Sequence, residues 1–285
     1  MNEIQAKYEK SEYCDKPHLT INVDGKSLDI MLHELYPEKS LIGLVPTLLD
    51  WLGDRKERRL VWDRFESMQK QVVPILMCPD DVDLWCSVIN VEVEKTENSV
   101  KWLRIGIDLS SSDPMPDSIG TNVEWFDKIE PMEFEKAKYE KFGSAFKTEI
   151  DKDEIKQRIS FWINRINDKE VIPKSIKAFN FRIIKTESDY QIHLVGTNNH
   201  DSENDDWACE EYFKSKESYL NLGAGSKKWN GLEIQSIVKT GIEQFIETQI
   251  SPITFVHRAD FMTTGFDNGE LQRVKPKAPN LAKTQ

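Results

Sequence analysis

Two clusters of acidic residues are the features of the chain best suited to chemistry or recognition. The first follows an apolar segment and consists of Asp80, Asp81 and Asp83. The second contains six acids and one tryptophan but no basic residue, and its members are Asp201, Glu203, Asp205, Asp206, Trp207, Glu210 and Glu211. Clustered carboxylates bind divalent cations or attract the basic surface of another macromolecule. The sequence therefore offers two chemistries, metal binding and protein recognition.

We interpret both clusters as contact surfaces for a partner protein. A tryptophan contributes a large contact area to an interface, and the carboxylates around it steer a basic partner toward that area. A solvated acidic loop explains the second cluster equally simply. Three carboxylates at the end of a strand also suit Mg²⁺ or Ca²⁺, although their spacing lacks the glycine and ligand pattern of a calcium loop. A metal-dependent hydrolase using Asp80, Asp81 and Asp83 is therefore the alternative function.

The sequence lacks the usual motifs of cofactor binding. Residues 25–27 end like a phosphate-binding loop, but Thr20 stands where the first glycine is required. Residues 223–225 begin a glycine-rich segment, but Lys228 replaces the third glycine of a dinucleotide loop. The five histidines lie on separate segments. We therefore expect a protein that is not an enzyme, has no cofactor and holds no metal.

Composition limits the cellular setting and the partners. The 49 acidic and 38 basic residues give a net charge of −11, which argues against direct binding to nucleic acid but suits a basic protein partner. The first twenty residues are polar, and no apolar stretch approaches the roughly 20 residues that span a membrane. Four cysteines contain no Cys-x-x-Cys pair and predict reduced thiols. A cytoplasmic protein without membrane contact is expected.

Hydrophobic periodicity predicts the elements of the fold. Predicted helices cover residues 57–68, 123–146, 153–166 and 231–249. Predicted strands cover residues 18–23, 72–77, 86–94, 100–108, 179–185, 190–195, 253–262 and 270–274. This order predicts an α+β fold of two domains, with mainly antiparallel sheets and helices packed on one face.

Charge and composition suggest where the two domains divide. Residues 1–150 carry 29 acidic and 19 basic side chains, a net charge of −10, whereas the remaining residues have a net charge of −1. The highly charged residues 147–156 suit either a linker or the start of a helix. The predicted parts are an N-terminal domain of residues 1–148, a C-terminal domain of residues 149–274, and a flexible tail of residues 275–285.

Several segments resemble small bacterial immunity proteins, which are encoded beside polymorphic or contact-dependent toxins. In the second half the resemblance rests on residues 204–209 and 263–271, and in the first half on residues 76–83 and 100–106. It implies an antitoxin that binds and occludes a cognate toxin domain, protects the producing cell during bacterial competition, and has no catalytic residues. Toxins that act on nucleic acid, such as nucleases, are basic, so an acidic inhibitor would suit them. A scaffold or adaptor of a secretion system is a further alternative.

Overall fold

The computed structural model describes residues 1–110, 116–198, 212–217, 219–248, 254–267 and 269–274. These residues form four α-helices and three mostly antiparallel sheets, which confirms the predicted α+β class. The chain divides into two compact units, Met1–Ile150 and Asp151–Gln285. The border lies close to the one predicted from composition, and independent folding of the two parts stays a prediction.

The first unit contains two antiparallel sheets. The smaller sheet has the strand order β1 (Ile4–Glu9), β2 (His18–Val23) and β3 (Lys26–Ser27). The larger sheet has the order β4 (Val45–Pro46), β5 (Gln71–Met77), β6 (Val88–Lys95), β7 (Ser99–Asp108) and β8 (Val123–Trp125), and β9 (Met132–Glu135) also pairs with β7. Residues of both sheets enter one hydrophobic core.

Two short helices of the first unit precede the long third one. Helix α1 covers Leu28–Leu35 and α2 covers Arg55–Glu66. The Asp54 carboxylate begins α2 by accepting a hydrogen bond from the amide of Lys56 at 2.8 Å. Helical spacing then places Glu57, Val61 and Phe65 on one buried face. These three residues form the face of α2 that packs on the rest of the unit.

An aromatic cluster connects the sheet of the first unit to its helices. Trp102 of β7 is 1% exposed and lies edge-on to Phe134 of β9, with ring centroids 5.1 Å apart. Its indole Nε1 donates a hydrogen bond to the hydroxyl of Tyr139 at 3.3 Å. The ring of Tyr139 stacks on Phe65 of α2 with centroids 5.2 Å apart. Contacts among aromatic rings therefore determine where the start of the third helix packs.

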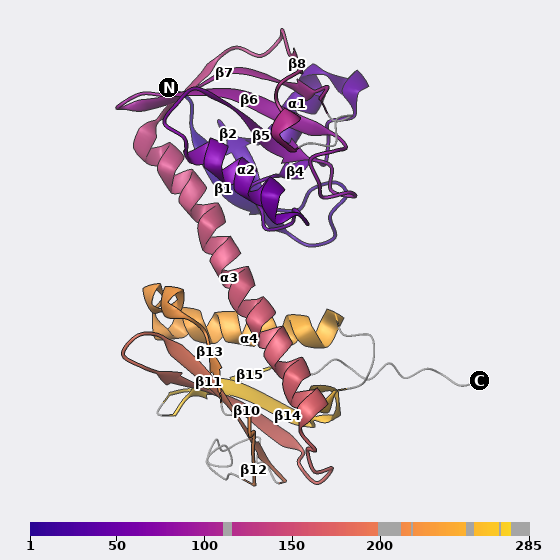
Figure 1. Cartoon of the computed structure of the whole chain (residues 1–285), viewed down its shortest axis with the longest axis vertical. Helices are drawn as coiled ribbons and strands as arrows, with labels where there is room; N and C mark the ends of the chain where they lie inside the picture. The colour runs from indigo at the N-terminus through magenta and orange to yellow at the C-terminus, as the bar shows by residue number, and fades with distance from the viewer. Residues whose placement is uncertain (111–115, 199–211, 218, 249–253, 268, 275–285) are drawn as a thin grey trace, which may run out of the picture. The chain divides into compact units, whose positions relative to one another are not determined.

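Helix α3 (Lys136–Lys169) supplies residues to both units (Figure 1). Phe146 is buried in the core of the first unit, and Ile155 is buried in the core of the second. Residues 147–156, predicted as a linker or a helix start, lie inside this helix. They contain neither glycine nor proline. The charged run therefore continues the helix instead of interrupting it.

Two predicted elements are wrong. Residues 123–146 were expected to form one helix, but strands β8 and β9 occupy the first part and the helix begins only at Lys136. Pro131 is incompatible with a helix interior. Phe134 is buried in the core of the sheet, where its ring packs against Trp102. Residues 255–258 were expected in a strand but form a 3₁₀ helix, whose first turn is closed by a capping box at Thr254.

The second unit has one sheet with the strand order β12 (Phe213–Lys214), β11 (Tyr190–Thr197), β10 (Ala178–Lys185), β14 (Phe261–Phe266) and β15 (Gln272–Arg273). Strand β13 (Leu220–Asn221) also pairs with β11. The predicted hairpin of β10 and β11 is confirmed, with Lys185 opposite Tyr190. The pairing of β10 with β14 is parallel and is made possible by the crossover through helix α4 (Gly231–Thr248).

The helices of the second unit pack on one face of its sheet, as predicted (Figure 1). Phe179, Phe181 and Ile183 alternate along β10 and share a core with residues of α3 and α4. Asn180 points to the opposite face, where it accepts a hydrogen bond from Thr263 at 3.2 Å. Short 3₁₀ helices complete the described chain at Pro37–Lys39, Pro116–Ser118, Ala224–Lys228 and Phe255–Arg258.

The packing of α2 against α3 depends on Gly143. A Cβ atom at this position would lie 2.6 Å from Cε1 of Phe65, whose ring is already stacked on Tyr139. Replacing glycine by alanine within a helix normally stabilises a protein by up to ~1 kcal/mol. We expect Gly143→Ala to do the opposite and lower the free energy of unfolding by about 1–3 kcal/mol, measured in urea, because the ring must leave its stacked position on Tyr139 to make room for the new methyl group.

A second variant shows whether the ring is the cause. Adding Phe65→Leu to Gly143→Ala removes the clashing atoms, so the double variant should lose less stability than the sum of the two single changes. Ser144→Ala, one residue along the same helix, is the control for a general effect on α3. Equal stability of the wild type and Gly143→Ala would show that the two helices are not packed as closely as described.

Candidate functional site

The predicted acidic residues lie in different parts of the chain, and only one cluster can be placed. Residues 201–211, which contain the seven-residue patch around Trp207, lie outside the described residues. Asp80, Asp81 and Asp83 lie in the loop of residues 78–87 between β5 and β6, which we call the acidic loop. Asp80 and Asp81 are exposed and Asp83 is half-buried. The Asp83 carboxylate accepts a hydrogen bond from the amide of Trp85 at 2.8 Å, so it stabilises the loop itself.

A buried glutamate of α2 stabilises the acidic loop. Glu57, in the first turn of α2, is 2% exposed, and its carboxylate accepts hydrogen bonds from the backbone of Leu84 and the side chain of Trp85. Leu84 is fully buried. Val82 adopts a left-handed conformation with φ 46°, which is rare for a β-branched residue, and its side chain packs on the core. The loop is therefore held in one shape by buried contacts at several points.

Burial raises the pKa of Glu57. The main cause is the loss of hydration, which disfavours the charged carboxylate, and the negative charges of Asp83 and Asp54 act in the same direction. The hydrogen bonds from Leu84 and Trp85 oppose this shift but do not cancel it. Neither the position nor the burial of Glu57 was expected from the sequence, because a glutamate in a charged helix is usually on the surface.

Two cysteines and one aspartate come together at the base of the acidic loop. One potential ligand atom from each of Cys78, Asp81 and Cys86 lies within 4.8 Å of the others. Cys78 is half-buried, whereas Asp81 and Cys86 are exposed. A hydrogen bond to Asp81, together with burial and the nearby Cys78 thiol, raises the pKa of Cys86 to about 11. Asp80 and Asp83 do not belong to this group.

Sequence reasoning did not single out the two cysteines, because eight positions separate them and no motif spans that distance. The pairing of Met77 with Val88 brings the two ends of the loop side by side. That strand register is the only signal that relates Cys78 to Cys86, and it exists only in the folded sheet.

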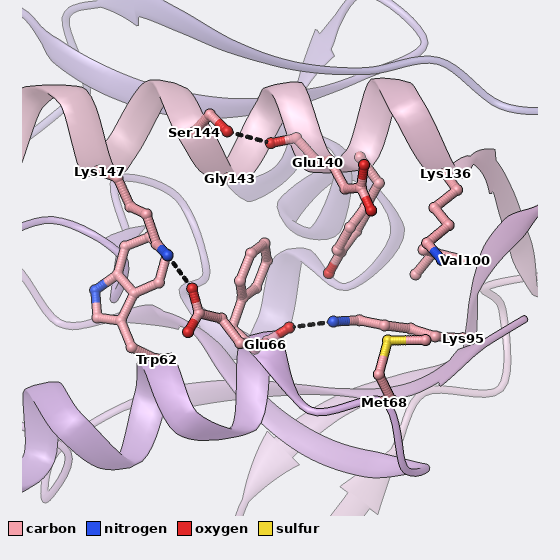
Figure 2. Close-up of a pocket in the computed structure, with 12 residues that line it drawn as sticks. Trp62, Glu66, Met68, Lys95, Val100, Lys136, Glu140, Gly143, Ser144 and Lys147 are labelled. Carbon is pink, nitrogen blue, oxygen red and sulfur yellow. Dashed lines mark hydrogen bonds and ion pairs between the residues drawn. The ribbon is translucent and has the colours of Figure 1, made fainter. Parts of the chain in front are cut away.

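A pocket of about 310 Å³ lies at the other end of α2 (Figure 2). Its apolar lining comes from Trp62, Phe65, Met68, Val100 and Tyr139, and its charged lining comes from Glu66, Lys95, Lys136, Glu140 and Lys147. Gly143 and Ser144 complete the wall contributed by α3. Figure 2 shows the two helices facing each other across the pocket, with aromatic rings between them.

Two lysines of the pocket, Lys95 and Lys147, interact with other residues that line it. The half-buried Lys95 donates a hydrogen bond to the carbonyl of Phe65 at 2.5 Å, at the negative end of the α2 dipole. Loss of hydration lowers the pKa of Lys95. Lys147 forms an ion pair with Glu66, and its Nζ lies 5.3 Å from the ring centroid of Trp62. The pocket therefore combines an aromatic floor with a charged rim.

The pocket has an apolar centre and charged residues around it. The hydroxyl of Ser144 donates a hydrogen bond to the carbonyl of Glu140 at 2.8 Å, so its proton is engaged within α3. The 60% exposure of Met68 places a flexible apolar group at the entrance. An apolar centre surrounded by charged groups is the usual arrangement of an interface.

Comparisons with known proteins identify no relative: no family model, no curated protein and no solved structure matches this chain. Residue roles therefore have to be argued from the site itself. In the described part of the chain, every helix is too short or too polar to span a bilayer.

The raised pKa of Glu57 predicts a pH-dependent stability. Below about pH 4.5, the ordinary value for glutamate, the carboxyl is protonated in both the folded and the unfolded chain. As the pH rises above this value the unfolded chain loses the proton first, so folding becomes less favourable until the pH exceeds the folded-state pKa. We expect Glu57→Gln, which keeps one acceptor for Leu84, to remove this loss and to be at least as stable as the wild type at pH 7.

The measurement is the free energy of unfolding in urea between pH 4 and pH 7.5 for both proteins. The stability of Glu57→Gln relative to the wild type should rise with pH across this interval. Glu34→Gln, at a glutamate whose side chain is 58% exposed, corrects for the removal of one negative charge. A difference between Glu57→Gln and wild type that falls with pH would show that Glu57 is stabilised as an anion.

Proposed function

We propose that the chain is a cytoplasmic immunity protein that binds a cognate bacterial toxin domain and occludes it, protecting the producing cell. The proposal combines the resemblance noted in the sequence with the character of the acidic loop. Occlusion requires a stable complex and no chemistry. Interfaces of this kind bury roughly 1,200–2,000 Å² in total, which the first unit alone has enough surface to provide.

The observation that carries this proposal is the rigid presentation of exposed carboxylates. Asp80 and Asp81 are exposed on a loop whose shape is held by Glu57 and Leu84. A loop that is already ordered loses little conformational entropy when a partner binds. The loop belongs to the half of the sequence with a net charge of −10, so its local field adds to that of the whole unit.

A basic partner is the one that this surface attracts. Complementary charge raises association rates by about 10- to 1,000-fold at low salt, and this effect weakens as salt screens the field. A toxin that acts on nucleic acid carries the required positive surface. The patch of residues 201–211 is proposed as a second acidic contact on the basis of its sequence alone.

The pocket beside α2 supports protein binding independently of charge. Its floor of Phe65 and Tyr139 is apolar, and it is wide enough to receive one large side chain of a partner. Interfaces draw most of their affinity from a few side chains inserted in this way. By contrast, a hydrolase built on Asp80, Asp81 and Asp83 would need the three carboxylates to converge, and within the described residues only Asp81 joins a group of potential ligands.

The first test is co-purification of the chain with the toxin encoded beside it. We expect one complex on size exclusion at micromolar concentration, and inhibition of the toxin at a stoichiometric ratio. Separate elution of the two proteins under these conditions would refute the proposed function.

The acidic loop is tested by reversing one charge. Asp80→Lys should slow association with the toxin by about three- to tenfold at low salt, because the steering field is weakened at the contact. Dissociation should change less. Stopped-flow measurement at several salt concentrations should also show a shallower dependence of the association rate on salt.

Glu97→Lys is the matched control for this experiment. Glu97 is exposed in the turn at the opposite end of β6, so the substitution changes the net charge by the same amount at a different place. It should slow association less than Asp80→Lys. Equal effects of the two variants would mean that only the net charge matters and that the acidic loop is not the contact.

A further inference from the structure

We propose that Cys78, Asp81 and Cys86 form a binding site for a soft divalent cation of the Zn²⁺ type. This inference goes beyond the proposed inhibition of a toxin and does not depend on it. The three residues come from a single loop that joins two neighbouring antiparallel strands.

The fold brings the three side chains together by ordinary strand pairing. Met77 is the last residue of β5 and lies opposite Val88, the first residue of β6. Cys78 directly follows Met77 in the chain, and Cys86 lies two positions before Val88. The amide of Val82 donates a hydrogen bond to the carbonyl of Cys78 at 3.2 Å, which closes a tight turn. This turn folds Asp81 back toward the two cysteines.

The distances are close to those of a bound cation. Zn²⁺ binds sulfur at about 2.3 Å and carboxylate oxygen at about 2.0–2.2 Å, so two ligands of a tetrahedral site lie roughly 3.5–3.8 Å apart. The three potential ligand atoms are at most 4.8 Å from one another. A contraction of about 1 Å in these distances would allow all three atoms to coordinate one cation.

The choice of ligands selects the kind of metal. Thiolates are soft ligands and prefer Zn²⁺ to Mg²⁺ or Ca²⁺, which require sets of oxygen atoms. A divalent cation displaces the protons of the two thiols when it binds, and its charge then offsets the repulsion among two thiolates and one carboxylate. Because Asp81 and Cys86 are exposed, the fourth position of a tetrahedron is open to water or to a ligand atom from a partner.

The experiment uses the full chain, reduced and stripped of metal. Zn²⁺ is titrated against a chromophoric chelator, and Co²⁺ is used as a spectroscopic substitute. We expect one equivalent of Zn²⁺ to bind with a Kd below micromolar. Bound Co²⁺ should show the thiolate-to-metal charge-transfer absorption that only cysteine coordination produces.

Four variants test the identity of the ligands. Cys86→Ser and Asp81→Asn should each weaken Zn²⁺ binding, by about 100-fold or more for the cysteine and about 10- to 100-fold for the aspartate. Asp80→Asn and Cys14→Ser are matched controls, since Asp80 is the adjacent exposed aspartate and Cys14 is a free thiol elsewhere in the first unit. Both controls should bind Zn²⁺ within twofold of the wild type.

Several results would overturn the site. One is the absence of stoichiometric Zn²⁺ binding by the folded, reduced chain, and another is equal loss of affinity in Asp80→Asn and Asp81→Asn. A Cys78–Cys86 disulfide that persists in the chain purified from cytoplasm without reductant, detected by mass spectrometry, would instead assign the pair to redox chemistry. A double variant lacking Cys14 and Cys209 should still bind, which excludes the remaining thiols. Since the toxin is absent from these measurements, failure here leaves the proposed inhibition untouched.

Discussion

Glu57, Val61 and Phe65 form the buried face of α2, and both parts of the candidate site depend on how that face packs. At one end of the helix the Glu57 carboxylate accepts hydrogen bonds from the acidic loop. Two turns later Phe65 forms the floor of the pocket and stacks on Tyr139. The buried face of α2 therefore contains both an ionisable carboxyl group and an aromatic ring. The hydrogen bonds that the carboxylate makes to the loop offset only part of the cost of burying it, and its pKa is therefore raised.

This arrangement explains how an acidic protein can present its charge without losing order. Repulsion among carboxylates destabilises a compact state, and a loop rich in aspartate would ordinarily be mobile. Here the side chain of Asp83 accepts a hydrogen bond from the backbone, and Leu84 enters the core. Val82 adopts an unfavourable φ angle and packs, half-buried, on the core. Asp80 and Asp81 are consequently exposed on a rigid base. Rigidity of this kind serves a binding surface and a metal site equally, since both require ligands that are already in place.

Helix α3 gives the two units a shared element of structure. Its first turns complete the aromatic core that contains Trp102 and Phe134, and its later turns supply Ile159 and Ile163 to the second core. Between these anchors, residues 147–154 are polar apart from Ile150. These polar residues can remain helical because both ends of the helix are held by packing, and a helix in a protein owes most of its stability to such contacts.

The sequence by itself determined the α+β class, the acidic character of the first half and the hairpin of β10 and β11, because these follow from periodicity, charge and turn residues that act locally. Only the tertiary structure decided that the first part of the predicted helix at residues 123–146 forms strands, where pairing with β7 overrode the local pattern. The meeting of Cys78 with Cys86 follows from the register of β5 on β6, and the burial of Glu57 follows from the packing of α2 beneath the loop. Contacts of this kind between distant segments have no signature in a single sequence, since a glutamate in a charged helix or a cysteine in a polar loop is equally compatible with a solvated position.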